Sequence, residues 1–122
     1  MSQEIKYAYI KSHPLFTDAG EQCIKDAVEV MKMRTVFRGE SLSYGEGDFS
    51  KIYLLIQGKV KIAETNKDCN ELIKDIVTAP DIFGDLSMEG NAPKDEYAEA
   101  LTANTIVCAF TIAGFKIILN NN

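Results

Sequence analysis

The sequence predicts a mainly β domain: a jelly-roll (double-stranded β-helix) barrel with N-terminal helices and one short helix inserted late in the chain. Apolar residues recur every three to four residues before position 33 and every second residue after it. Turn-forming residues separate the later apolar runs at short intervals. The 122 residues, 46% hydrophobic and 25% charged, suffice for one core, so residues 1–122 are expected to form a single domain.

The first part of the chain, residues 4–33, is expected to form two helices. His13 precedes Pro14, and a residue before proline avoids the α region, so the first helix should end there. Asp18 is predicted to cap the second helix. Apolar residues then recur at helical spacing, and a third helix is expected at residues 113–119.

The middle of the chain is expected to be strands, at residues 35–37, 41–44, 52–56, 59–64, 72–77, 97–103 and 105–110. Residues 59–62 alternate cleanly, which places Val60 and Ile62 inward and Lys59 and Lys61 on a solvated face. Asn70 tolerates the left-handed conformation and is expected to support the hairpin turn beside Cys69, an exposed turn residue.

The chain is organised around residues 80–101. An apolar run ends at Gly84, where a backbone without Cβ can turn sharply or approach another group closely. Asp85 suits the N-cap of a one-turn helix at residues 86–89, and Lys94 lies on the loop that follows. Unpaired N–H groups and a nearby cation would together form an anion site. The alternative is that this segment is only a strand, a helical turn and a return loop.

Composition excludes several functions. The formal net charge of −5 argues against nucleic-acid binding by this chain. Three widely spaced cysteines, Cys23, Cys69 and Cys108, indicate reduced thiols in a cytoplasmic protein without a zinc or iron–sulfur site. The sequence also shows neither a signal peptide nor a membrane-spanning run.

Catalysis is not expected either. Cupin enzymes use this barrel architecture and build metal sites from two or three histidines with a carboxylate, but His13 is the only histidine. No Ser-His-Asp or Cys-His set can be assembled. We therefore predict no enzymatic turnover, no metal and no cofactor.

Between residues 14 and 119 the chain resembles the sensor domain of the Crp/Fnr (catabolite activator) family of bacterial transcription regulators. More broadly, it is similar to the cyclic-nucleotide-binding domain. The order and spacing of several short motifs carry the resemblance: Pro14-Leu15-Phe16, Gly39-Glu40, Gly47-Asp48, residues 52–62, residues 81–87, Ala100-Leu101 and Phe115.

The resemblance implies a phosphate cassette, in which the family has Phe-Gly-Glu-Leu, a short helix, and Arg followed by Ser, Thr or Ala. The Glu accepts from the ribose 2′-hydroxyl and the Arg holds the cyclic phosphate. The corresponding ligand-binding candidates here are Phe83, Gly84, Asp85, Leu86, Ser87, Lys94 and Asp95.

Three of these candidates depart from the family pattern. Asp85 is one methylene shorter than Glu, and Lys94 lacks the bidentate fork of Arg. Asp95 places a carboxylate beside the expected phosphate, and like charges repel. We therefore expect Lys94 to pair with an acidic neighbour, cyclic AMP to bind weakly or not at all, and the effector to be another, unidentified small molecule.

The resemblance implies the sensor half of a bacterial transcription regulator whose parent protein is a homodimer. In that family a long dimerisation helix and a helix-turn-helix domain follow; residues 1–122 do not include them, so DNA contact would come only through that domain. The first alternative is a true cyclic-nucleotide-binding module of a kinase, channel or other effector protein. A small cupin-like enzyme is the second, disfavoured by the histidine count.

Overall fold

The computed structural model describes residues 3–45, 50–87 and 95–120. Its helices are α1 (Gln3–Ser12), the 3-10 helix η1 (Pro14–Phe16), α2 (Glu21–Val30) and α3 (Ile112–Asn120). Its strands are β1 (Lys32–Val36), β2 (Ser41–Ser43), β3 (Lys51–Gln57), β4 (Lys59–Thr65), β5 (Glu71–Thr78), β6 (Ile82–Gly84), β7 (Glu96–Ala100) and β8 (Thr105–Thr111).

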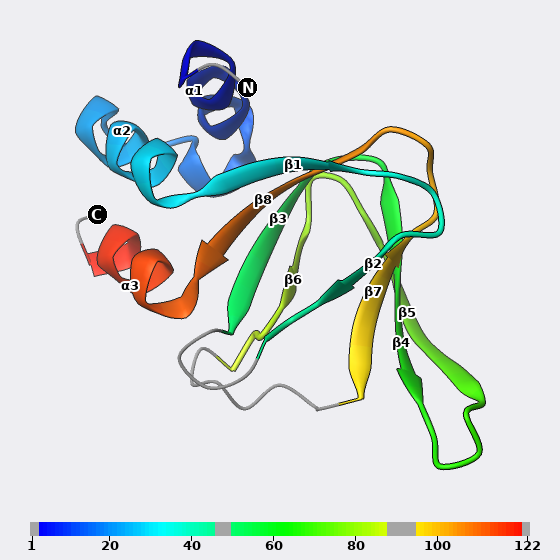
Figure 1. Ribbon diagram of the computed structural model, residues 1–122. Helices are drawn as coiled ribbons and strands as arrows, with labels where there is room; N and C mark the ends of the chain where they lie inside the picture. The colour runs from blue at the N-terminus through cyan, green and yellow to red at the C-terminus, as the bar shows by residue number, and fades with distance from the viewer. Residues whose placement is uncertain (1–2, 46–49, 88–94, 121–122) are drawn as a thin grey trace.

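The described strands form two antiparallel four-stranded sheets that face each other, with the helices gathered at one side (Figure 1). The strand orders are β1-β8-β3-β6 in the first sheet and β2-β7-β4-β5 in the second. Neighbours in each sheet are mostly distant in sequence, as a rolled-up barrel requires. The predicted mainly β jelly roll with N-terminal helices is confirmed.

Strand β3, in the middle of the first sheet, is buried on both faces. Ile52 and Leu54 of β3 pack with the helices in one core, whereas Tyr53 and Leu55 pack with the second sheet in another. Successive strand residues point to opposite faces, so a strand buried on both sides reads as a continuous apolar run. The inner core lies between the sheets and reaches the candidate site.

The helical predictions need two corrections. The first helix ends at Ser12, before His13 and Pro14, as predicted. Asp18 does not cap α2, because Gly20 occupies the N-cap position and makes no side-chain capping bond. The second helix also stops earlier than predicted, because Met31 has an extended backbone and is buried.

The strand boundaries differ by a few residues, and one side-chain prediction and one backbone prediction are wrong. Val60 and Ile62 are buried and Lys59 is exposed, as predicted. The Lys61 side chain, however, is only 15% exposed and lies 2.7 Å from a Glu71 oxygen, so it belongs to an ion pair. In the hairpin, Cys69 takes the positive φ of 61° that we expected at Asn70.

Candidate functional site

Strand β6 carries the candidate site into the space between the sheets. Its three residues pair with β3, and the Phe83 ring stacks on Tyr53 with ring centroids 5.0 Å apart. Directly after β6, the Asp85 N–H donates to the Lys51 carbonyl at 3.0 Å. Since side chains alternate along a strand, Asp85 lies on the same inner face as Phe83.

Gly84 allows this close approach of two backbones. Its φ is +112°, and a Cβ built there would lie 2.5 Å from the carbonyl oxygen of Lys51. No L side chain tolerates both conditions without strain. The predicted role of Gly84 as a point of sharp turn and close approach is thus supported by the geometry.

The Asp85 carboxylate is almost fully buried, with 1% of the residue exposed. Its Oδ1 accepts a hydrogen bond from the Ser87 N–H at 3.2 Å and a short one from the Ser87 hydroxyl. Its Oδ2 has no hydrogen-bond partner among the described residues. The carboxylate therefore orders the turn after β6, as a capping residue does, and keeps one oxygen for another donor.

The remaining candidate ligand-binding residues that the structure describes do not gather in one buried site with Asp85. Leu86 is 60% exposed, and Ser87 and Asp95 are exposed as well. The Asp95 carbonyl accepts from the Thr65 N–H at 3.3 Å, which fixes this residue beside the end of β4. Lys94, its predicted ion pair, and the second half of the predicted helix at 86–89 lie outside the described residues, so these predictions stay open.

The structure adds a cluster that local sequence patterns did not reveal. Lys74 Nζ lies 2.5 Å from a Glu96 carboxylate oxygen and 3.6 Å from a Glu64 oxygen. Glu64 and Glu96 are Cα partners across β4 and β7. We call Glu64, Lys74 and Glu96 the inner charge cluster.

This cluster lies at the open edge of the space between the sheets, where the Glu64 and Lys74 side chains are 39% and 38% exposed and the Glu96 side chain is 12% exposed. Glu64 alternates with the buried Val60 and Ile62, and Glu96 alternates with the buried Ala98. Burial raises the pKa of the Tyr44 hydroxyl, and the negative charge of Glu96 and a hydrogen bond to it raise this pKa further. The hydrogen bond from Lys74 to Glu96 raises the pKa of that lysine and keeps it protonated.

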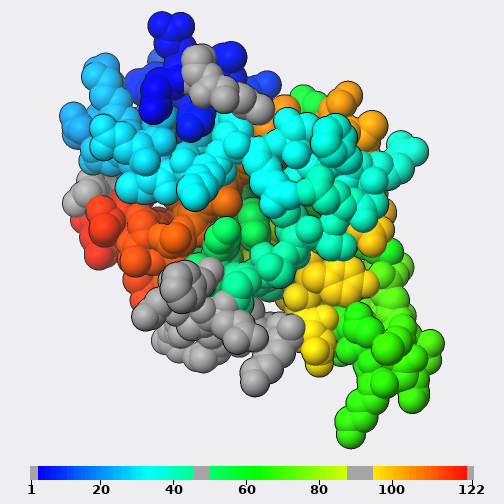
Figure 2. Space-filling view, viewed as in Figure 1, coloured from blue at the N-terminus to red at the C-terminus, as the bar shows by residue number. Residues whose placement is uncertain are grey.

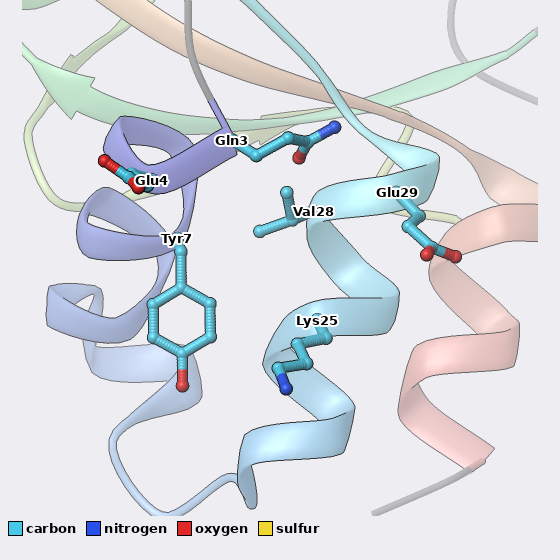
Figure 3. A pocket seen from close by; sticks show the side chains of 6 residues that line it. All are labelled: Gln3, Glu4, Tyr7, Lys25, Val28 and Glu29. Atoms are coloured by element: carbon cyan, nitrogen blue, oxygen red, sulfur yellow. The ribbon is translucent and has the colours of Figure 1, made fainter.

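Other hollows lie away from this cluster. A groove of about 560 Å³ runs between α1 and α2, where Tyr7 faces Lys25 and Val28 (Figure 3). It belongs to the helical layer, on the side of the first sheet opposite Asp85. A cleft of about 380 Å³ between β2 and the first sheet contains two cations, Arg34 and Lys51.

We searched the described residues for a metal-binding group of side chains and for a membrane-spanning helix. The described residues contain no group of three or more His, Cys, Asp and Glu side chains that could hold a metal ion. None of the described helices has the length and apolar character needed to cross a membrane.

Sequence comparison decides the family. The profile of the cyclic nucleotide-binding domain matches residues 34–122, which include β6 and the turn at Asp85. The chain belongs to the cyclic nucleotide-binding domain family. Members of this family typically serve as regulatory sensor modules, and nothing in the geometry of the described residues shows enzymatic activity. Comparison with curated protein sequences gives no match.

Solved structures share the fold at low sequence identity. The regulatory subunit of a cAMP-independent protein kinase A from Trypanosoma brucei is 17% identical, with a TM-score of 0.77 over 97% of this chain and 43% of that one. The sensor domain of the regulator DNR from Pseudomonas aeruginosa is 20% identical, with a TM-score of 0.78 over 98% and 80%. The catabolite activator protein of Thermus thermophilus is 19% identical, with a TM-score of 0.68 over 88% and 50%. The chain thus spans half or less of the kinase subunit and the activator.

Proposed function

We propose that this cyclic nucleotide-binding domain is the effector-sensing domain of a Crp/Fnr-like bacterial transcription regulator, and that its effector carries no phosphate. The fold shared with two transcription regulators, the DNR sensor domain and the catabolite activator protein, supports the first half of the proposal, together with the order of short motifs along residues 14–119. The second half rests on the charges of the inner face.

The inner charge cluster is the observation that carries the effector assignment. A cyclic phosphate is an anion and needs a cation that is not already neutralised. Lys74 lies on the inner face, but Glu96 and Glu64 hold it between them. Like charges that lie close together repel, and solvent screening weakens this repulsion where the groups are exposed. Two carboxylates beside one lysine therefore disfavour a phosphate.

Asp85 indicates which kind of polar group the effector presents to the inner face. In nucleotide-binding members, the residue at this position is a Glu that reaches the ribose. Here the shorter Asp85 uses Oδ1 to bind the Ser87 N–H and hydroxyl, and among the described residues only Oδ2 of this carboxylate stays unpartnered. The buried Oδ2 accepts from a neutral or cationic donor such as a hydroxyl or an amine. A polar, phosphate-free small molecule fits this set of groups.

Regulation would then follow from the fold. The effector binds between the sheets, and the proposal assigns DNA contact and the long dimerisation helix to other parts of a cytoplasmic parent protein. This domain binds and transmits but does not catalyse. The kinase-type alternative is favoured by one observation, the TM-score of 0.77 to a regulatory subunit described as cAMP-independent.

The test of the parent protein is direct. We expect the gene to encode a long helix and a basic helix-turn-helix after residue 122, and the full-length protein to bind a specific DNA site in an effector-dependent manner. A kinase, channel or membrane domain in that position would overturn the assignment. Binding to DNA that no cell extract or metabolite pool alters would overturn the sensing role.

A further inference from the structure

Strand β5 is the longest described strand and forms an edge of the second sheet, where it pairs with β4. All of its residues except Val77 are exposed. Leu72, Ile73 and Ile76 are large apolar residues with 58%, 54% and 48% of their surface exposed. The β4–β5 hairpin projects beyond the rest of the barrel (Figures 1 and 2). Long apolar edges invite pairing with another strand, so natural proteins usually cover or interrupt them.

The second half of β5 offers backbone groups to such a strand. The Ala79 N–H donates to the Gly58 carbonyl at 3.1 Å, so this end of the strand turns its odd-numbered amides toward β4. The Ile76 N–H consequently faces away from β4. It donates instead to the carboxylate of its neighbour Asp75, at 2.8 Å.

The first half offers backbone groups on the same side. The Asn66 N–H donates to the Asn70 carbonyl at 3.0 Å. In this half of the strand the backbone N–H and C=O groups of the even-numbered residues therefore point toward β4, and those of Ile73 point away from it. The register between β4 and β5 shifts between Ile62 and Ala63. This bulge inserts one residue into β5 and lets Ile73 and Ile76, three positions apart, expose the same backbone edge.

The order of residues in β5 is complementary to itself. We propose that β5 pairs antiparallel with β5 of a second copy of this chain, about a two-fold axis between Lys74 and Asp75. In that register Ile73 faces the second copy's Ile76, and Leu72 faces its Val77. Both residues of each apolar pair lie on one face of the sheet. Ile73 and Ile76 share the outer face, since their partners on β4 are Ala63 and Lys61. Leu72 and Val77 share the inner face, since their partners on β4 are Glu64 and Val60.

The charges match in the same register. Lys74 of each copy faces Asp75 of the other, which gives two cross-strand pairs of opposite charge. When the strands pair, the Ile76 N–H donates to the Ile73 carbonyl of the second copy. The Asp75 carboxylate then no longer accepts from the Ile76 N–H and pairs with Lys74 of the second copy. Both copies use the same edge, so the contact closes as a symmetric dimer and does not grow into a fibre. This interface goes beyond the proposed function, although Lys74 belongs both to the interface and to the inner charge cluster.

Analytical ultracentrifugation over a concentration series tests the interface. We expect the average mass of the wild-type chain to rise from 13.5 kDa toward twice that value. Ile76→Lys should keep the chain at 13.5 kDa, whereas the matched control Ile117→Lys should dimerise like wild type, because Ile117 is 56% exposed on α3. Hydrogen exchange of the Ile73 amide should slow as the concentration rises.

Charge complementation gives a more specific test. Asp75→Lys sets lysines against lysines, and Lys74→Asp sets aspartates against aspartates, so each variant alone should be monomeric. An equimolar mixture should form heterodimers, because every facing pair is then opposite in charge. A wild type that stays monomeric at every concentration, an equal loss of dimer in Ile117→Lys, or a folded pair of charge variants that fails to associate on mixing would overturn the proposal.

Discussion

Replacing Gly84 by alanine should destabilise the domain more than the same replacement at Gly39 or Gly20. The new Cβ would lie 2.5 Å from the Lys51 carbonyl oxygen and 3.3 Å from the Ile52 Cα and the Tyr53 ring. The positive φ alone costs about 1–2 kcal/mol, and the overpacking adds about 1–3 kcal/mol. We expect a total loss of about 2–5 kcal/mol, which at roughly 4 °C per kcal/mol lowers Tm by about 8–20 °C.

The two other glycines separate these contributions. Gly39 has φ +86°, but no described atom lies within 4 Å of the place that an added methyl group would take, so Gly39→Ala isolates the backbone cost. Gly20 has neither a positive φ nor a close neighbour among the described residues, so Gly20→Ala should leave Tm almost unchanged. Thermal unfolding of the three variants by circular dichroism gives the ranking. If Gly84→Ala unfolds no earlier than Gly39→Ala, the close approach of β6 to β3 is not what requires glycine here.

Two further predictions concern titratable groups. Burial lowers the pKa of His13, whose Nδ1 accepts a hydrogen bond from the Leu15 N–H at 3.1 Å. The neutral His13 side chain therefore contributes its full share of stability above the pKa of the unfolded state, about 6.5. That contribution is lost as the pH falls toward the lowered pKa of the folded state. Urea unfolding between about pH 7 and 5.5 should therefore show a loss of stability that His13→Asn abolishes; an unchanged slope in the variant would refute the role of His13. A thiol reagent should rapidly label the exposed Cys69 and be slow with Cys108, because burial raises the pKa of the Cys108 thiol to about 12. Rapid modification that persists in Cys69→Ser would contradict this.

Local patterns in the sequence predicted most of the fold. The alternation through Val60 and Ile62 identified the inner face of β4, and Pro14 marked the end of the first helix. Both signals depend on neighbours within a few residues. The prediction that Asp18 caps the second helix was wrong for the same reason, because it depended only on a side chain suited to capping. The helix begins after Gly20, and this N-cap residue makes no side-chain hydrogen bond.

The site was predictable only in part. Gly84 stood out because its residue type fits a sharp turn, and its positive φ agrees. Asp85 accepts a hydrogen bond from the Ser87 N–H, but the predicted helix that it would cap lies partly outside the described residues, so its role as a cap stays a prediction. The inner charge cluster depends instead on the order of β5, β4 and β7 in the sheet and on the bulge that brings Lys74 to Glu64 and Glu96. Lys61 escaped prediction likewise, because its partners Glu71 and Glu99 lie on separate strands. Such cross-strand contacts leave no mark on local periodicity.

Titration calorimetry with cyclic AMP and cyclic GMP tests the proposed function most directly. We expect no binding heat from this chain or from its full-length parent. A variant that restores the family pattern, Asp85→Glu with Lys94→Arg and Asp95→Ser, and also removes the two carboxylates of the inner charge cluster by Glu64→Gln and Glu96→Gln, should gain measurable affinity for cyclic AMP. Such binding would show that the scaffold and the assay are competent. Micromolar binding by the unmodified chain, lost on Lys94→Ala, would contradict the proposal and restore cyclic nucleotides as the effector.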